Sequence, residues 1–156
     1  MKKLLNKKLF VLLILILLIF SGCNQNTIDI TSPLFSVTQP QYKSASEDSR
    51  CVIGGVYFDF YNKADCRVVY LETRMNVYDK STGKSAFAGY GTITSADEVQ
   101  IKKGEIRQMC VPLDQYITVV PQAGYYIDQF YVNLIEYEDG KIWKDECGLY
   151  ACGSRE

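Results

Sequence analysis

The stretch that most constrains the fold of this chain is the apolar run at residues 125–137. Ile127 and Ile135 fall on one face of this run and Phe130 on the other. Successive side chains of a strand point to opposite faces, so a strand of this composition needs cover on both sides. The run therefore predicts a central strand of a layered β structure.

Other segments carry the same kind of signal. Aromatic and β-branched residues dominate 52–61, while apolar and polar residues alternate along 67–78. Further strands are expected at 85–94, 99–101, 106–111 and 141–144, with 95–98 as a loop and turns spaced by roughly ten residues. No segment after residue 23 has a helical period. The pattern predicts an all-β chain that forms an antiparallel β-sandwich of about seven strands.

Two glycine-containing dipeptides predict local backbone geometry. Asp139-Gly140 is a strong signal for a two-residue type I′ hairpin turn, which would place Tyr137 opposite Ile142 and Glu136 opposite Trp143. Gly54-Gly55 predicts a bulge or bend in the strand at 52–61, where Gly55→Ala should destabilise the domain less than Gly140→Val.

The N-terminus predicts export. Four lysines precede twelve unbroken apolar residues at 9–20, which are too few for a membrane-spanning helix of ~20 residues. The small residues Ser21 and Gly22 then precede Cys23. This arrangement resembles the signal peptide and lipobox of bacterial lipoproteins, in which the cysteine takes a diacylglyceryl group. The sequence predicts a lipoprotein signal peptide at 1–22 and lipidation at Cys23; an ordinary signal peptide is the alternative.

The rest of the chain divides into two parts by composition. Residues 23–50 are rich in Asn, Gln, Ser and Thr and predict a lipidated cysteine followed by a flexible tether. Apolar residues near 28–35 could dock locally. Residues 51–156 are expected to form the domain. Such a chain would be anchored by lipid to the cell membrane or the outer membrane, facing the periplasm or the cell exterior.

Charge and composition exclude several functions. Four of the 17 Lys and Arg lie in the predicted signal segment, whose removal leaves 13 against 18 Asp and Glu, a net charge of −5. No basic run remains, so no nucleic-acid partner is expected. The chain contains no histidine, which removes Ser-His and Cys-His catalysis and histidine-based zinc sites.

Five cysteines remain beyond Cys23, and because this number is odd at least one must be free or paired outside the chain. Two bridges among five cysteines can be drawn fifteen ways. Cys147 and Cys152 form the favoured pair, since Gly148 lets the short loop between them turn. Small buried thiols are an alternative for Cys66 and Cys110. A zinc site would need two more good ligands, so no metal and no cofactor are predicted.

Tyrosine is the distinctive excess, with twelve in the chain. Its flat amphipathic ring suits protein-binding and sugar-binding surfaces, but it also packs well in strands. Tyr116, Tyr125 and Tyr126 border an irregular segment at 112–124. These three residues are the candidate binding surface, although packing within the strands explains most of the other tyrosines.

A family resemblance is carried by residues 75–79, Met-Asn-Val-Tyr-Asp. They are similar to the Phe-x-Leu-Tyr-Asp signature of FxLYD-type Ig-like domains, with Met in place of Phe and Val in place of Leu. The turn at 61–62, the turn at 103–105 and the strand end at 137–140 also match, so the resemblance covers roughly 52–143. It implies an Ig-like sandwich in which Tyr78 and Asp79 close a strand and open a turn.

The resemblance implies a small exported bacterial module and carries no common activity. The expected function is therefore a lipid-anchored binding or adaptor module of the cell envelope, without catalysis, that recognises an envelope protein or a glycan. The alternative is an envelope hydrolase that uses two of the many carboxylates, although no spacing singles out a pair. A cleft that holds two carboxyl groups would favour the hydrolase.

Overall fold

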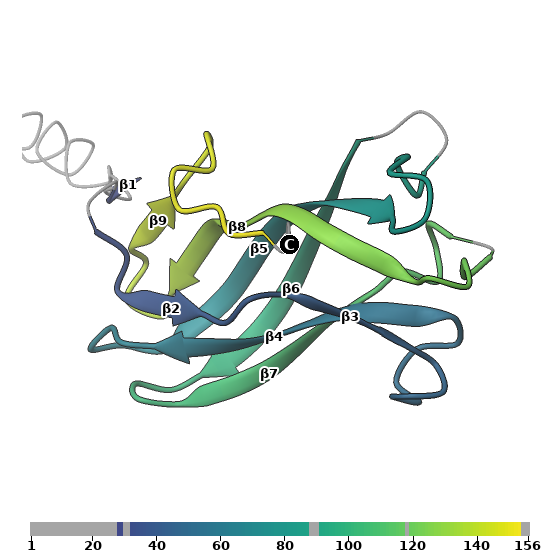
Figure 1. Ribbon diagram of the computed structural model, residues 1–156. Helices are drawn as coiled ribbons and strands as arrows, with labels where there is room; N and C mark the ends of the chain where they lie inside the picture. Colours follow the sequence, from purple (N-terminus) through teal and green to yellow (C-terminus); the bar gives the residue numbers. More distant parts are fainter. Residues whose placement is uncertain (1–27, 30–31, 88–90, 118, 154–156) are drawn as a thin grey trace, which may run out of the picture.

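The computed structural model describes residues 28–29, 32–87, 91–117 and 119–153, which form two facing β-sheets (Figure 1). The strands are β1 (Ile28–Asp29), β2 (Phe35–Val37), β3 (Gln41–Ser44), β4 (Gly54–Asn62), β5 (Val68–Asp79), β6 (Thr92–Ile101), β7 (Ile106–Pro112), β8 (Tyr125–Tyr137) and β9 (Ile142–Lys144). The described residues contain no helix, which confirms the all-β prediction.

The two sheets have the strand order of an Ig-like sandwich. One sheet, called sheet A, runs β1-β9-β8-β5-β6. In the other, called sheet B, β4 pairs with β7 along one side and with β2 and β3 along the other. All pairings are antiparallel except that of the short β1 with β9. Since β4 and β7 lie in one sheet and β5, β8 and β9 in the other, the chain crosses between layers as Ig-like domains do.

The core lies between the layers and follows the predicted alternation. Val56, Phe58 and Phe60 of β4 are buried, and the Phe58 ring packs on Phe130 of β8 with centroids 4.7 Å apart. Met75, which lies on β5 of the facing sheet, is also fully buried. The central position predicted for residues 125–137 is confirmed, because β8 pairs with β5 on one side and β9 on the other.

The expectation of a flexible tether as far as residue 50 is wrong for its second half. Phe35 pairs with Asn62 at the start of β2, and Gln41 pairs with Tyr57 at the start of β3. The Phe35 side chain is only 6% exposed. The two short strands complete one edge of sheet B, so the polar composition of this segment concealed its place in the fold.

The prediction of a loop at 95–98 is also wrong, because these residues belong to β6. Their partners lie on the twelve-residue β5, where Thr73 pairs with Ser95 and Tyr70 with Glu98. Polar side chains are compatible with a strand here because β6 is an edge strand of sheet A with exposed positions along its length.

The β8–β9 hairpin differs from the prediction by one residue. Glu136 pairs with Ile142, and Ile135 pairs with Trp143. The Tyr137 N–H donates to the Lys141 carbonyl at 3.0 Å, which leaves a three-residue loop at 138–140. A two-residue register would have set Trp143 beside Glu136, which is exposed, whereas this register sets it beside the buried Ile135. Burial of the tryptophan therefore selects the longer loop.

The turn itself is a type I turn followed by a left-handed residue. Gly140 has a φ of 82° and its N–H donates to the Tyr137 carbonyl at 2.9 Å. Asp139 does not have a positive φ, so the predicted type I′ geometry is wrong. A three-residue hairpin loop needs a left-handed residue at its last position, which glycine adopts without strain.

Replacing Gly140 with valine should destabilise the domain. A β-branched residue held at positive φ costs roughly 1–3 kcal/mol, and the midpoint of urea denaturation should fall accordingly. Gly140→Asn is the control, because asparagine tolerates the left-handed region far better. Equal midpoints for the valine variant and the wild type would contradict this assignment of the loop.

Gly54 and Gly55 pair regularly with the neighbouring strands, so the predicted bulge is wrong. Instead, atoms of other residues pack closely against these two glycines. A Cβ at Gly54 would lie 2.6 Å from the Tyr42 hydroxyl and 2.8 Å from the Lys43 carbonyl oxygen. One at Gly55 would lie 2.8 Å from the Cys51 Sγ. An added methyl group at Gly55 would therefore force its neighbours to shift, and whether Gly55→Ala is milder than Gly140→Val stays a prediction.

Candidate functional site

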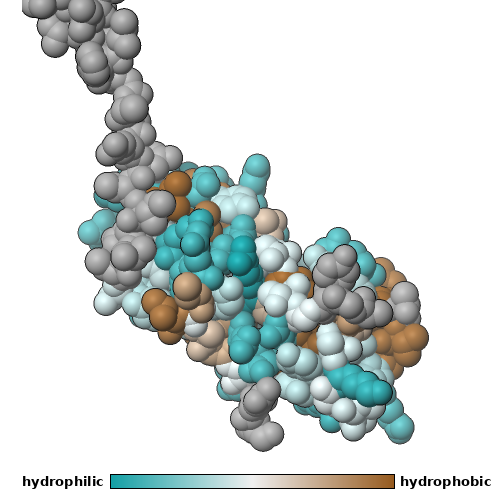
Figure 2. Space-filling view, turned by 90° about the horizontal axis from the view of Figure 1, so that it is seen from above, coloured by the Kyte–Doolittle hydropathy of each residue, from teal (hydrophilic) through white to brown (hydrophobic). Residues whose placement is uncertain are grey.

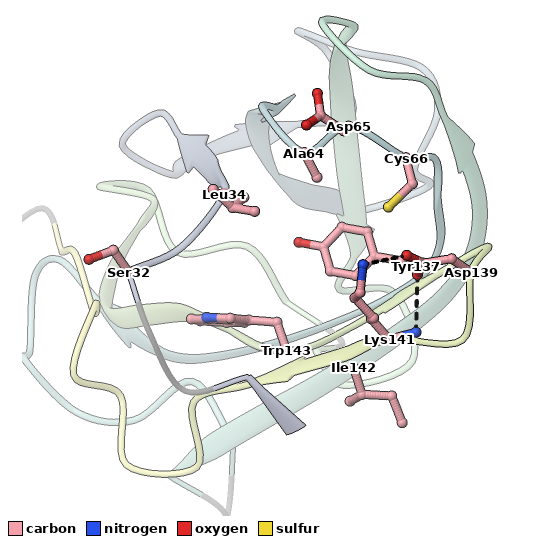
Figure 3. A pocket seen from close by; sticks show the side chains of 10 residues that line it. All are labelled: Ser32, Leu34, Ala64, Asp65, Cys66, Tyr137, Asp139, Lys141, Ile142 and Trp143. Atoms are coloured by element: carbon pink, nitrogen blue, oxygen red, sulfur yellow. Dashed lines mark hydrogen bonds and ion pairs between the residues drawn. The ribbon is translucent and has the colours of Figure 1, made fainter. Parts of the chain in front are cut away.

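A cavity of about 310 Å³ opens at one end of the sandwich. It lies where β9, the turn at 62–66 and the segment before β2 come together (Figure 3). The lining residues are Ser32, Leu34, Ala64, Asp65, Cys66, Tyr137, Asp139, Lys141, Ile142 and Trp143. Ligand sites are concave and mostly apolar with a few polar groups, so this cavity is the candidate functional site.

The interior of the cavity is apolar and rigidly supported. Trp143 is 3% exposed, and its ring meets the edge of Phe35 with centroids 4.8 Å apart. Figure 3 shows the Tyr137 and Trp143 rings along the cavity, with the Cys66 thiol pointing toward Tyr137. Leu34 is 53% exposed and stands at the mouth. An apolar group that entered would exchange water for these carbon surfaces.

The turn that forms one wall depends on Asn62, whose side chain is fully buried. Its Nδ2 donates to the carbonyl oxygens of Cys66 at 2.9 Å and Ile101 at 3.0 Å. Its Oδ1 accepts the N–H of Ala64 at 3.0 Å. One amide therefore closes the 62–66 turn on itself and ties it to the end of β6.

Charged groups lie at the rim of the cavity in opposite-charge pairs. Lys141 Nζ contacts Asp139 Oδ2 at 2.8 Å, and Lys103 pairs with Asp65. The hydrogen bond from Lys141 holds the pKa of Asp139 below its ordinary value, and the hydrogen bond from Lys103 does the same to the pKa of Asp65. Both carboxyl groups are therefore ionised near neutral pH.

This electrostatic arrangement bears on the hydrolase alternative. The cavity does bring two carboxyl groups, Asp65 and Asp139, to its lining. A glycosidase needs one carboxyl group with a raised pKa to act as general acid, and neither of these has one. Burial raises the pKa of the Cys66 thiol, so it is not an activated nucleophile at neutral pH.

The structure does not gather the three tyrosines predicted as a binding surface. Tyr125 is 6% exposed, and its hydroxyl donates to the Val119 carbonyl at 2.6 Å. Tyr126, its neighbour in β8, is stacked on Tyr78 with centroids 5.2 Å apart. Tyr116 is 39% exposed and meets Phe87. Because adjacent strand residues point to opposite faces, Tyr125 and Tyr126 do not share a surface, and the buried Tyr125 offers no exposed ring to a partner. Binding through Tyr116 or Tyr126 stays a prediction.

Exposed apolar side chains occur on several segments of the described chain. On the side seen in Figure 2, brown apolar patches are divided by polar residues. The large apolar side chains exposed among the described residues are Leu34, Val52, Ile106, Tyr116, Val119, Val120, Leu149 and Tyr150. Most of them fall in two short segments, 116–120 and 149–150, and of the set only Leu34 lines the cavity, which is the better-formed place for recognition.

The predicted disulfide between Cys147 and Cys152 is not formed in the structure, where both residues have free thiols. Cys152 is held in a bridge to β8, with its N–H donating to the Phe130 carbonyl at 2.7 Å. Cys147 is exposed. The pairing of these two residues stays a prediction.

Several predictions fall on residues whose structure is not described. The signal peptide at 1–22 and the lipidation site Cys23 lie outside the described residues. Within the described part, no helix is long and apolar enough to cross a membrane. The same part contains no cluster of three or more acidic, cysteine or histidine side chains that could hold a metal ion.

Comparison with known proteins adds no relative. No protein-family model matches the sequence. A search of the curated proteins also finds no significant match.

Sequence reasoning missed the residues that line the cavity. Trp143 is the only tryptophan in the chain, and its place directly after a hairpin was the one available signal. The assumed two-residue turn put it beside an exposed glutamate and hid its role. Leu34 belongs to the segment predicted as a tether, and Cys66 is predicted only as a small buried thiol.

Proposed function

We propose that this chain is a lipid-anchored binding module of the bacterial cell envelope, without catalytic activity, that binds an apolar group of a partner protein in the cavity beside Trp143. The observation that carries the proposal is the cavity itself, with an apolar interior and a rim of paired charges. A protein partner fits better than a glycan. Sugars stack on exposed aromatic faces, and Trp143 and Tyr137 are both buried.

The place of the cavity suits a partner close to the membrane. Strand β1 pairs through Ile28 and Asp29 with Ile142 and Trp143, both of which line the cavity. Ile28 is only five positions after Cys23 along the chain, a reach of at most ~18 Å. A lipid on Cys23 would hold the cavity end of the domain toward the headgroups, so the partner is a membrane-associated envelope protein.

The test compares two exposed apolar positions in the full lipid-anchored chain. Leu34, 53% exposed, lines the cavity, whereas Val52, 84% exposed, does not. In Leu34→Arg, entry of an apolar group would desolvate the arginine charge at the mouth of the cavity. Recovery of the partner from detergent-solubilised membranes should therefore fall at least about tenfold, which corresponds to ~1.4 kcal/mol of binding free energy. Val52→Arg should leave recovery unchanged. Equal recovery by both variants would overturn the cavity as the binding site.

The anchor is tested by labelling cells with an alkynyl fatty acid. The wild type should be labelled and remain with the membrane fraction, because two or more acyl chains give stable attachment. Cys23→Ala should be unlabelled. Labelling of that variant at the wild-type level would disprove lipidation at Cys23.

A further inference from the structure

The loop at 45–53 folds onto the outer face of sheet B. It connects β3 to β4, and the Ala45 N–H donates to the Ile53 carbonyl at 3.1 Å across its base. Val56 and Phe58 point into the core. Because side chains alternate along a strand, the neighbouring positions Gly55 and Tyr57 face outward from sheet B. Cys51, in the loop, lies over this outward face and is only 4% exposed.

A second cysteine meets it there from β7. Cys110 pairs with Tyr57 across the β4–β7 ladder, so its side chain shares the outward face. The Sγ atoms of Cys51 and Cys110 are 3.4 Å apart, although the two residues are 59 positions apart in the sequence. The Tyr57 hydroxyl lies 3.6 Å from the Cys51 Sγ.

Gly55 explains how two sulfur atoms fit on a sheet surface. A Cβ at this position would lie 2.8 Å from the Cys51 Sγ, 3.0 Å from the Cys110 Sγ and 3.1 Å from the Val111 carbonyl oxygen. Real Cβ atoms essentially never lie within 3.0 Å of a neighbouring heavy atom, and the two longer distances are also tighter than most Cβ contacts. The space that a side chain at Gly55 would occupy is therefore taken by the pair of thiols.

We propose that Cys51 and Cys110 form a disulfide in the exported protein, which fastens the 45–53 loop to β7. The bond needs an S–S distance of about 2.05 Å, so the sulfur atoms must approach by roughly 1.4 Å, within the range of side-chain rotation. The proposal requires the export that the N-terminal sequence predicts, but it does not depend on the cavity or its partner.

The oxidant is the disulfide of an envelope dithiol–disulfide oxidoreductase. The half-buried Cys110 loses its proton, and its thiolate attacks one sulfur of that disulfide, releasing a thiolate of the partner and forming a mixed disulfide. The deprotonated Cys51 then attacks the Cys110 sulfur and releases the second partner thiolate. Two electrons pass from the two thiols to the partner, whose disulfide becomes a dithiol.

Burial raises the pKa of Cys110 to about 11, despite the nearby Arg50 guanidinium, which acts in the opposite direction. Its thiolate is therefore scarce at neutral pH. In the purified reduced chain with oxidised glutathione, the rate of bond formation should rise about tenfold per pH unit between pH 7 and pH 9.

The bond is tested by alkylating the full membrane-anchored chain without reductant and then digesting it for mass spectrometry. Peptides containing Cys51 and Cys110 should be found joined, with the loss of two hydrogen atoms, in at least tenfold excess over the alkylated forms. Reductant should lower the melting temperature of the wild type by more than that of the Cys51→Ser/Cys110→Ser variant, which retains the predicted Cys147–Cys152 pair. Alkylation of both cysteines in the exported chain, or a bond from either to another cysteine, would overturn the proposal.

A glycine pair provides a second, independent readout. Gly55→Ala should lower the joined fraction at least tenfold because the added methyl group competes with the sulfur atoms. Gly91→Ala is the matched control, since nothing lies within 4 Å of its added Cβ. An unchanged joined fraction in Gly55→Ala would contradict the packing on which the proposal rests.

Discussion

Replacing Phe35 with alanine should lower the free energy of unfolding by about 3–5 kcal/mol, the usual cost of removing a buried phenylalanine. Its ring stacks on Phe60 with centroids 5.4 Å apart and meets the edge of Trp143 at 4.8 Å. Alanine would leave a hole between β2, β4 and β9 that these rigid rings cannot fill. A domain of this size has a total stability of only about 5–15 kcal/mol, so the loss should be obvious in urea denaturation.

The adjacent residue supplies the control for this prediction. Leu34 is 53% exposed, so Leu34→Ala should shift the urea midpoint far less than Phe35→Ala. If Phe35→Ala were as mild as Leu34→Ala, the segment at 35–44 would be a tether, as its composition suggests, and not part of sheet B.

Asn62→Ala should cost about 3 kcal/mol of unfolding free energy. The change removes the side chain that bonds the Cys66 and Ile101 carbonyl groups and the Ala64 N–H. Each buried backbone group left without a partner costs about 1–3 kcal/mol, offset where water enters the space. Because this turn forms a wall of the cavity, the variant should also bind the partner more weakly at temperatures where it remains folded.

Asn76→Ala is the matched control, measured in the same urea titration. The Asn76 amide makes two hydrogen bonds, to Gln129 and Thr92, and both partners are exposed side chains that water can satisfy. Asn76→Ala should lose much less unfolding free energy than Asn62→Ala. Equal losses would show that burial of the Asn62 network contributes nothing.

Much of the fold was predictable because strand alternation is a local property. Leu71, Met75 and Val77 alternate with polar residues in the sequence, and all three are buried in the structure. The end of β5 was predictable for the same reason. Asp79 accepts the N–H groups of Ser81 at 2.7 Å and Thr82 at 3.0 Å, as a short acidic side chain does when it opens a turn.

The candidate site was much less predictable. Its geometry depends on a register difference of one residue in the β8–β9 hairpin, which changes the strand face on which Trp143 lies. It also depends on a segment before β2 whose composition resembles a linker. The sequence favours Tyr125 over the cavity residues as part of a binding surface, and yet the structure buries its side chain.

The sequence by itself determined that the described chain is all-β, that 125–137 is its central strand and that a hairpin follows at 139–140, because turns and alternation are encoded among neighbouring residues. Tertiary structure alone decided the length of that hairpin loop, the recruitment of Phe35 to the core and the meeting of Cys51 with Cys110. These outcomes depend on pairings between residues far apart along the chain. Such pairings are selected by how completely the two layers bury their facing side chains, and no short stretch of sequence contains that information.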